Sequence, residues 1–436
     1  MTLFSSSMTR VRRRTLAATA AAACLVLTAQ GAPAQAARTA QAAPSAQAAP
    51  AQAAPAQAAA LSSADWAEAS LPSSYYVGDT VSPVSCVRGT RFCAAITEDS
   101  ANIVNGYYIG QAALVSTNAG KSWHGYATLT LNALSCVSAS VCWAAGTNFQ
   151  GKPGVAETTD GGQTWTDMSL ASWATATWWP NSIECVSATN CWLMGQDEPQ
   201  GLVAPALLET TDGGATWTQL SNLPSVTSAD PNGTYQLNGM SCVSALSCVA
   251  VGGLDYGDGK SVVITTADGG ASWTLSADPT LAKSNELFSV SCLPTAAGTV
   301  HCAAAADALE AAGPVTLISR DGGATWGHRQ IFDDTGWLNS ISCGTVQHCW
   351  AAGGGTSVGL LGTQDDGTSW SAVTSDTSNQ DGTVSCLNGQ VCVAAIDDGI
   401  WVTQDDGGLG STGSPATGAS TTGSPATGAG GTASHR

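Results

Sequence analysis

The chain has 436 residues, of which 44% are hydrophobic, and carries 14 basic against 32 acidic residues, a net charge of −18 at pH 7. Such a negative surface repels phosphate backbones, which excludes nucleic acid as an expected partner. Beyond the N-terminal region no run of residues is long and apolar enough to span a bilayer as a helix, so no membrane span is expected.

The first 36 residues have the pattern of a secretory signal peptide. Four arginines between residues 10 and 14 precede an apolar run at 16–29, and the sequence A-Q-A at 34–36 provides small residues for cleavage. The arginines leave export by the Sec or the twin-arginine route open. Removal of residues 1–36 leaves 10 basic and 32 acidic residues and a net charge of −22. The mature protein is therefore expected to be secreted and extracellular, with its acidity serving solubility.

Two low-complexity segments flank the remaining chain. Residues 37–60 repeat Ala, Gln and Pro, and residues 411–436 contain TGSPATGA twice. Neither has a pattern that could bury one face, so both are expected to be disordered, as a linker and a tail. The folded domain is expected to span residues 61–410.

This domain is organised around an eight-residue motif, TTDGGQTW at residues 158–165. Its Asp can accept backbone N–H bonds from the residues after it, the Gly two positions on can adopt positive φ, and the Trp can anchor the returning strand. Other copies lie at 116–123, 210–217, 266–273, 319–326, 363–370 and 403–408. Their acidic position holds Asp160, Asp212, Asp268, Asp321, Asp365 and Asp405, with Asn118 in the first copy. Seven copies at intervals of 40 to 56 residues indicate a repeat array.

The pattern S/T-x-D-x-G-x-T/S-W resembles the Asp-box (BNR) repeat of sialidases, some glycoside hydrolases, sortilin-type receptors and photosystem II assembly factors of the Ycf48 type. The resemblance covers residues 61–408. It implies a β-propeller, because these families carry the box on propeller blades. It implies little about function, because the box lies on a structural turn.

The spacing between boxes accommodates four short strands per repeat. In the second repeat these are expected at 133–136, at 142–145, at 155–159 and from Trp165 onward. The seventh box is followed directly by the tail, so its blade lacks an outermost strand, and residues 65–72 resemble the strand that follows a box elsewhere. The sequence predicts an all-β fold: a single seven-bladed β-propeller of four-stranded antiparallel blades, closed by the N-terminal strand pairing into the last blade.

The cysteines also repeat seven times, with one local pair in each repeat. Apart from Cys24, they form seven local pairs: Cys86/Cys93, Cys136/Cys142, Cys185/Cys191, Cys242/Cys248, Cys292/Cys302, Cys343/Cys349 and Cys386/Cys392. Each pair is expected to flank the turn between a blade's first and second strands, where opposed residues are close enough to bridge. Export favours seven disulfides, and the pairs lack the C-x₂-C spacing of a metal site, so no metal or cofactor is expected.

The boxes and the cysteine turns should share one face, which leaves the opposite face for a ligand. The loops of that face hold aromatic residues beside carboxylates, and this composition suits sugars, because flat rings stack on pyranoses and carboxylates accept hydroxyl protons. The candidate ligand-binding residues are Tyr75, Tyr76, Asp79, Trp178, Trp179, Tyr235, Asp333, Asp334 and Trp337. The alternative, that such aromatics pack between blades and such aspartates are solvated turn residues, stays open.

Sialidase chemistry is not expected, although the repeats resemble that family. It needs three arginines on a carboxylate and an early R-I-P motif, and the domain has four arginines, of which three fall on the box face, and no R-I-P. A hydrolase using two carboxylates about 5–9.5 Å apart stays the alternative, with Asp333 or Asp334 opposite Asp79 or Asp99 as the first pair to consider. The leading hypothesis is a secreted, monomeric, non-catalytic binding or scaffold protein for a glycan or a protein.

Overall fold

The computed structural model describes residues 66–72, 80–98, 103–104, 107–108, 112–127, 131, 133–147, 152–168, 170, 178–197, 204–226, 235–254, 260–308, 315–330, 336–354, 359–374, 382–396 and 399–403. The chain divides into Met1–Gln57 and Ala58–Arg436, and all described residues belong to the second unit. The expected signal peptide, the linker, the C-terminal tail and Asp405 of the seventh box lie outside the described residues.

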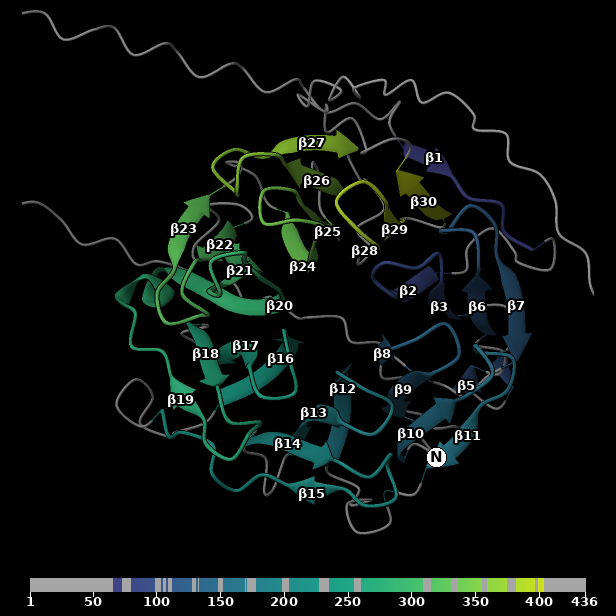
Figure 1. Cartoon of the computed structure of the whole chain (residues 1–436), viewed down its shortest axis with the longest axis horizontal. Helices are drawn as coiled ribbons and strands as arrows, with labels where there is room; N and C mark the ends of the chain where they lie inside the picture. The colour runs from purple at the N-terminus through teal and green to yellow at the C-terminus, as the bar shows by residue number, and fades with distance from the viewer. Residues whose placement is uncertain are drawn as a thin grey trace, which may run out of the picture. The chain divides into compact units, whose positions relative to one another are not determined.

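Seven four-stranded antiparallel sheets form the blades of a ring, which confirms the predicted propeller (Figure 1). Blade 1 contains β2 (Thr80–Cys86), β3 (Cys93–Glu98), β6 (Ala112–Ser116) and β7 (His124–Ala127); blade 2 contains β8 (Ala133–Cys136), β9 (Cys142–Thr147), β10 (Pro153–Thr158) and β11 (Thr166–Met168). Blade 3 contains β12 (Trp178–Cys185), β13 (Cys191–Asp197), β14 (Ala204–Thr210) and β15 (Thr218–Gln219); blade 4 contains β16 (Tyr235–Cys242), β17 (Cys248–Leu254), β18 (Ser261–Thr266) and β19 (Thr274–Leu275). Blade 5 contains β20 (Ser284–Pro294), β21 (Val300–Ala308), β22 (Val315–Ser319) and β23 (Gly327–Gln330); blade 6 contains β24 (Trp337–Cys343), β25 (Cys349–Gly354), β26 (Leu360–Thr363) and β27 (Ser371–Thr374).

The seventh blade combines the two ends of the domain. It contains β28 (Thr383–Cys386), β29 (Cys392–Ile396) and β30 (Gly399–Thr403), and its outermost strand is β1 (Trp66–Glu68). Trp66 lies opposite Thr403 and Glu68 opposite Trp401 in an antiparallel pair. Trp66 is buried against Trp350 of blade 6, with ring centroids 5.0 Å apart.

Two further elements lie outside the blades. β4 (Ile103–Val104) and β5 (Tyr107–Tyr108) form a separate hairpin within the connection between β3 and β6. A short 3₁₀-helix, Pro279–Lys283, precedes β20. None of the helical segments in the described ranges has the length and apolar character needed to cross a membrane.

The core lies between neighbouring blades. The second strands are rich in small residues that are fully buried, for example Ala144 and Ala145 in β9 and Ala351 and Ala352 in β25. Small side chains at these positions let adjacent sheets approach closely. Large rings follow the second cysteine in three blades, where Trp143, Trp192 and Trp350 are at most 1% exposed.

All seven expected disulfides are present and join directly opposed residues of the first and second strands. The bonds are Cys86–Cys93, Cys136–Cys142, Cys185–Cys191, Cys242–Cys248, Cys292–Cys302, Cys343–Cys349 and Cys386–Cys392. Because each loop is short, opening it restores little chain entropy, and each bond is expected to add only about 2 kcal/mol.

The pair in blade 5 corrects one detail of the expectation. Cys292 and Cys302 are bonded as predicted, but they do not directly flank the turn. The two strands continue beyond them, with Leu293 opposite His301 and Pro294 opposite Val300. The four extra residues between these cysteines are used to lengthen the hairpin, so the disulfide lies inside the ladder rather than at its end. In the other six blades the first strand ends at one cysteine and the second begins at the other.

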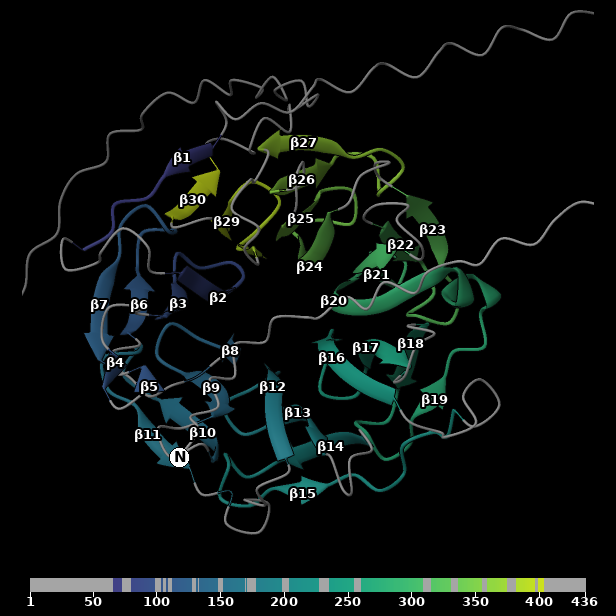
Figure 2. The same ribbon diagram turned by 180° about the vertical axis from the view of Figure 1, so that it is seen from behind.

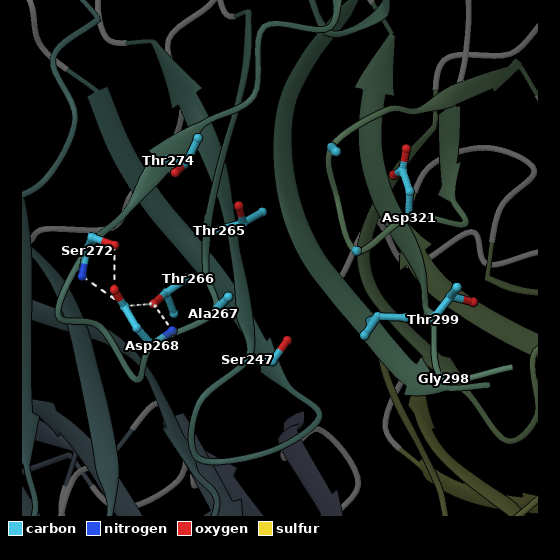
Figure 3. A pocket seen from close by; sticks show the side chains of 13 residues that line it. Ser247, Thr265, Thr266, Ala267, Asp268, Ser272, Thr274, Gly298, Thr299 and Asp321 are labelled. Carbon is cyan, nitrogen blue, oxygen red and sulfur yellow. Dashed lines mark hydrogen bonds between the residues drawn. The ribbon is translucent and has the colours of Figure 1, made fainter. Parts of the chain in front are cut away.

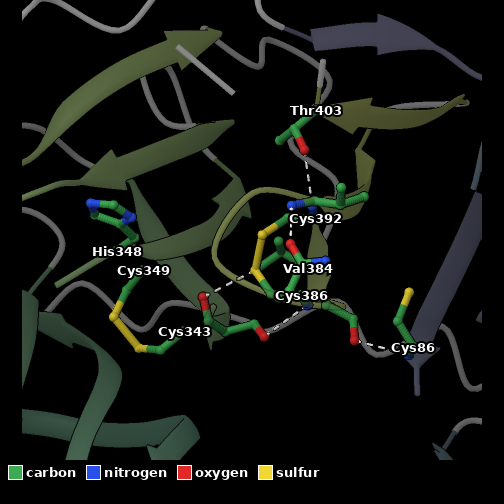
Figure 4. Close-up of a disulfide and its surroundings, with 12 residues drawn as sticks. Cys86, Cys343, His348, Cys349, Val384, Cys386, Cys392 and Thr403 are labelled. Carbon is green, nitrogen blue, oxygen red and sulfur yellow. Dashed lines mark hydrogen bonds between the residues drawn. A yellow bond between two sulfur atoms is a disulfide. The ribbon is translucent and has the colours of Figure 1, made fainter. Parts of the chain in front are cut away.

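One hydrogen bond repeats at every boundary between blades. The backbone N–H of each blade's first cysteine donates to the side chain that precedes the first cysteine of the previous blade. The pairs are Cys136 with Ser85, Cys185 with Ser135, Cys242 with Glu184, Cys292 with Ser241, Cys343 with Ser291, Cys386 with Ser342 and Cys86 with Ser385, at 3.0 Å except for 3.2 Å at Glu184. The last pair joins blade 7 to blade 1, so these bonds form a closed serine–cysteine ladder; Figure 4 shows Cys343, Cys386 and Cys86 on three successive inner strands.

The Asp-box turns are built by one network, well seen around Asp160. Thr158 donates its hydroxyl proton to Asp160 Oδ1 at 2.8 Å, while Thr164 donates its N–H to Oδ1 at 2.9 Å and its hydroxyl to Oδ2 at 2.6 Å. The hydrogen bonds from the Thr164 hydroxyl and then its N–H lower the pKa of Asp160 to about 2. In the first box the amide of Asn118 makes the equivalent contacts, with its Nδ2 donating to Ser122 Oγ at 2.8 Å.

Each of the six boxes that the structure describes in full donates a backbone N–H to the disulfide-linked hairpin of its own blade. Gly161 N–H donates to Ser140 O at 2.9 Å, and Gly269 N–H donates to Leu246 O at 3.0 Å. Gly161 has φ of 75°, and a Cβ there would lie 2.8 Å from Ala139 O, so a side chain is excluded by both conformation and space. The boxes and the cysteine turns therefore share one face, called the box face below.

Replacement of Asp212 tests the box network. We expect Asp212→Ala to lower the melting temperature at neutral pH by a few degrees, because two hydroxyls and a backbone N–H lose their acceptor. Asp212→Asn should lower it less, because Asn118 shows that an amide fits the turn.

The same variants should respond differently to acid. The hydroxyl of Thr216, followed by its N–H, lowers the pKa of Asp212. A lowered pKa in the folded state stabilises the fold above the unfolded pKa of about 3.9, and this contribution is lost as the pH falls further. The advantage of the wild type over Asp212→Asn should therefore shrink in acid; circular dichroism melts that show a constant difference, or equal melts for both variants, would contradict this account.

Candidate functional site

The face opposite the boxes is formed where the inner strands begin. Figure 2 views the ring from behind, with β12, β16, β20 and β24 around the centre. Trp178 and Trp179 begin β12, Tyr235 begins β16 and Trp337 begins β24, so three blades contribute to one end of the channel. Tyr75, Tyr76, Asp79, Asp333 and Asp334 lie outside the described residues.

Tyr235 has a packing role. Its side chain is 2% exposed and belongs to the core between blades 3 and 4, beside Met194 and Leu207. Its hydroxyl donates to Pro224 O at 3.1 Å, and burial raises the pKa of the phenol. The aromatic residues were interpreted either as ligand contacts or as packing between blades, and Tyr235 packs between blades.

A polar cluster lies at the start of the inner strands of blades 4 and 5. Asn238 Nδ2 donates to Glu286 Oε1 at 2.7 Å and to Leu287 O at 2.9 Å, and Gln236 Nε2 donates to the same carboxylate oxygen. All three side chains are half-buried, so each keeps some contact with solvent. We call Gln236, Asn238 and Glu286 the amide–carboxylate cluster.

The neighbouring blade extends this polar region. Asn181 Nδ2 donates to Leu237 O at 3.1 Å, which links blade 3 to blade 4. The pairing register shifts between Pro180 and Ser182 and between Leu237 and Gly239, so Asn181 and Asn238 are the extra residues of β-bulges. A bulge redirects a side chain from the regular alternation of a strand. Here it turns an amide toward the next blade.

These amides were not among the residues predicted from the sequence, because carboxylates and rings were taken as the candidate contacts. A signal was present: asparagine stands four positions before the first cysteine in four of seven repeats, as Asn132, Asn181, Asn238 and Asn339. The extra β4–β5 hairpin could also have been predicted from the sequence. The dipeptide Asn105–Gly106, which favours a hairpin turn, stands between two pairs of residues with high β-propensity.

At the box-face end of the channel, Arg88 crosses from blade 1 to blade 6. It lies in the turn between β2 and β3, and its Nη2 donates to Cys343 O at 2.6 Å. The residue as a whole is exposed to solvent, while its guanidinium contacts the backbone of blade 6. Burial lowers the pKa of Arg88, and the charge of Glu184 opposes this effect.

Glu184 is the exception in the serine–cysteine ladder, where six blades use serine. Burial raises the pKa of its carboxyl to about 7, although the N–H of Cys242 and the charge of Arg88 favour the ionised form. The ladder therefore contains one acceptor whose charge changes near neutral pH.

The box face has one further charged contact, between blades 5 and 6. Asp366 pairs with buried His301 and with Arg320, which donates from Nε at 2.8 Å and from Nη2. Asp366 has φ of 59° at a position where five of the other boxes carry glycine or alanine. The contacts with His301 and Arg320 hold the Asp366 side chain in place at this unfavourable backbone conformation. No group of three His, Cys, Asp or Glu side chains within the described ranges could hold a metal ion.

A scan against protein-family profiles gave no match, and no curated protein matched the sequence. Among solved structures, Ycf48 bound to D1 peptide is 16% identical with a TM-score of 0.52, covering 80% of this chain and 99% of that chain. Ycf48 from Cyanidioschyzon merolae is 14% identical with a TM-score of 0.53, covering 78% and 98%. A Hadza microbial sialidase is 12% identical with a TM-score of 0.46, covering 75% and 66%.

At these identities the likeness concerns the fold. The box pattern, the seven blades and the match to Ycf48 over nearly its whole length agree. The chain is a seven-bladed β-propeller whose blades carry Asp-box turns, and its fold is similar to that of Ycf48.

Substitution of Glu184 tests the exceptional position in the ladder. A raised carboxyl pKa favours the protonated group in the folded state, so this stabilisation is present below the unfolded pKa and is lost as the pH rises to about 7. Glu184→Gln keeps an oxygen acceptor without a charge, and Glu184→Ser restores the residue of the other blades. Both should gain stability over the wild type between about pH 4.5 and pH 7, by up to about 3 kcal/mol.

Chemical denaturation across this pH range measures the effect. If the wild type and both variants lose stability in parallel as the pH rises, the buried carboxyl does not control this part of the curve.

Proposed function

We propose that the protein is a secreted, non-catalytic binding module that holds a glycan or a protein on the face opposite the boxes. The observation that carries this proposal is the amide–carboxylate cluster at the start of two neighbouring inner strands. Seven disulfides support an oxidising, extracellular setting.

A glycan is the ligand class that this cluster supports best. Amide and carboxylate groups offer donors and acceptors side by side, which is what sugar hydroxyls require. Both amides contact Glu286 through Oε1, which fixes the orientation of the carboxylate for a hydroxyl donor at Oε2. Trp178, Trp179 and Trp337 begin inner strands of blades 3 and 6 and are proposed as stacking surfaces. Tyr75, Tyr76, Asp79, Asp333 and Asp334 remain proposed contacts.

The arrangement supports binding over catalysis. Glu286 is restrained by two amides, and hydrolysis needs a second carboxylate about 5–9.5 Å away. Arg88, Arg91 and Arg320 belong to the turns and boxes of the box face, so they cannot grip a substrate carboxylate on the other face. The second candidate function is an extracellular glycoside hydrolase that uses Asp333 or Asp334 with Asp79 or Asp99.

Binding to a panel of glycans, including cell-wall polysaccharides, tests the proposal. Glu286→Gln should weaken binding of a bound glycan by about tenfold, roughly 1.4 kcal/mol, because the amide replaces one of the two acceptor oxygens with an NH₂ donor. Glu157→Gln is a matched control, since it removes a half-buried carboxylate from β10 of blade 2. The control should bind as the wild type does.

Two results would overturn the proposal. Equal affinity of Glu286→Gln and the wild type for every glycan would remove the cluster from the site. Turnover of a chromogenic glycoside that is abolished by a single Asp→Asn change in a folded protein would establish the hydrolase instead.

A further inference from the structure

A groove on the box face, between blades 4 and 5, lies apart from the face considered above. It has a volume of about 590 Å³ (Figure 3). Asp268 and Ser272 of the blade 4 box line one wall, and Gly298 and Thr299 of blade 5 line the other with Asp321. The groove thus runs between the turns of two neighbouring repeats.

The wall formed by blade 5 contains a longer hairpin than the equivalent turns of the other blades. Cys292 and Cys302 are 10 positions apart, whereas the bonded cysteines of the other blades are 6 or 7 apart. The hairpin beyond this disulfide is held by its own turn. Thr295 N–H donates to Thr299 O at 2.8 Å, and Gly298 N–H donates to Thr295 O at 3.0 Å. The wall is therefore fixed before any ligand arrives.

The chemistry of the lining is anionic and rich in hydroxyls. Hydrogen bonds from Ser272 lower the pKa of Asp268. Burial raises that of Asp321, but the hydrogen bonds from Thr325 outweigh it and lower the pKa overall. Further hydroxyls in the lining belong to Ser247, Thr265, Thr266, Thr274 and Thr299. None of the described residues that line the groove is basic or aromatic, so it attracts cations and offers sugars no ring to stack on.

The rim adds an apolar contact. Leu246, next to the lining residue Ser247, is 60% exposed at the tip of the blade 4 turn. An exposed leucine at the rim of a groove with a carboxylate on each wall fits a partner that carries both positive charge and an apolar side chain. Backbone amides of an extended chain can also bond with the lining hydroxyls.

We propose that this groove binds an extended basic segment of a partner protein, with cationic side chains at Asp268 and Asp321 and an apolar side chain against Leu246. The box aspartates are needed for the fold, so the test leaves them in place and adds a competing charge. Ser247→Lys puts a cation into the groove. Asn190 has the same place in the turn of blade 3, since Val186 and Val243 donate equivalent N–H bonds to Asn190 O and Ser247 O. Asn190→Lys is therefore the matched control.

The probe is a fluorescein-labelled heptapeptide of alternating lysine and leucine, followed by fluorescence anisotropy. We expect Ser247→Lys and a second variant, Thr299→Lys, to weaken its binding by about tenfold or more. Asn190→Lys should bind nearly as the wild type does. Melting temperatures close to that of the wild type verify that each variant is folded.

The proposal is overturned if the peptide does not bind, or if Asn190→Lys weakens binding as much as Ser247→Lys, because attraction to overall charge would then suffice. It is also overturned if a glutamate–leucine peptide of equal length binds as well. Displacement of the basic peptide by a chito-oligosaccharide would assign the groove to glycans instead.

Discussion

The stability of the ring depends on hydrogen-bond acceptors for the unpaired backbone N–H groups at the free edge of each inner strand. The innermost strand of a blade has no strand on its channel side, so alternate N–H groups point toward the preceding blade without a partner in their own sheet. The serine–cysteine ladder supplies that partner with a hydroxyl, or with Glu184 at one boundary. A buried N–H without an acceptor costs about 1–3 kcal/mol, so seven such bonds are a strong constraint on blade packing. Blades 5, 6 and 7 add a second set, from Ile341 N–H to Ser289 Oγ and from Val384 N–H to Ser340 Oγ.

The ladder also explains why the two faces differ. Cys242 belongs at once to a ladder bond and to a disulfide, and the turn that the disulfide closes supports the Asp box of its blade through Leu246 O. Hydrogen bonds and disulfides therefore connect the box face from the channel to the rim. The opposite face begins beyond this network, where the bulged asparagines of blades 3 and 4 turn their amides toward the next blade.

The sequence predicted the ring well because its signals are local. The turn around Asp160 and the spacing of Cys136 and Cys142 are each set by residues a few positions apart, and repetition multiplies the signal. The candidate site was harder to predict, because its contacts join different blades. Asn238 and Glu286 are 48 positions apart in the sequence, and no local sequence pattern predicts that they form a hydrogen bond. Tyr235 shows the same difficulty, since only packing against blade 3 distinguishes a buried ring from an exposed one.

Amide hydrogen exchange at the first cysteine of each blade tests the central claim, that the serine–cysteine ladder closes the ring. The seven amides belong to Cys86, Cys136, Cys185, Cys242, Cys292, Cys343 and Cys386. A closed ladder predicts that all seven exchange at one slow rate set by global unfolding, with Cys86 at the junction of blades 7 and 1 as protected as the rest. Fast exchange at Cys86 while the other six amides stay protected would show that the ring opens at that junction, and would contradict the account.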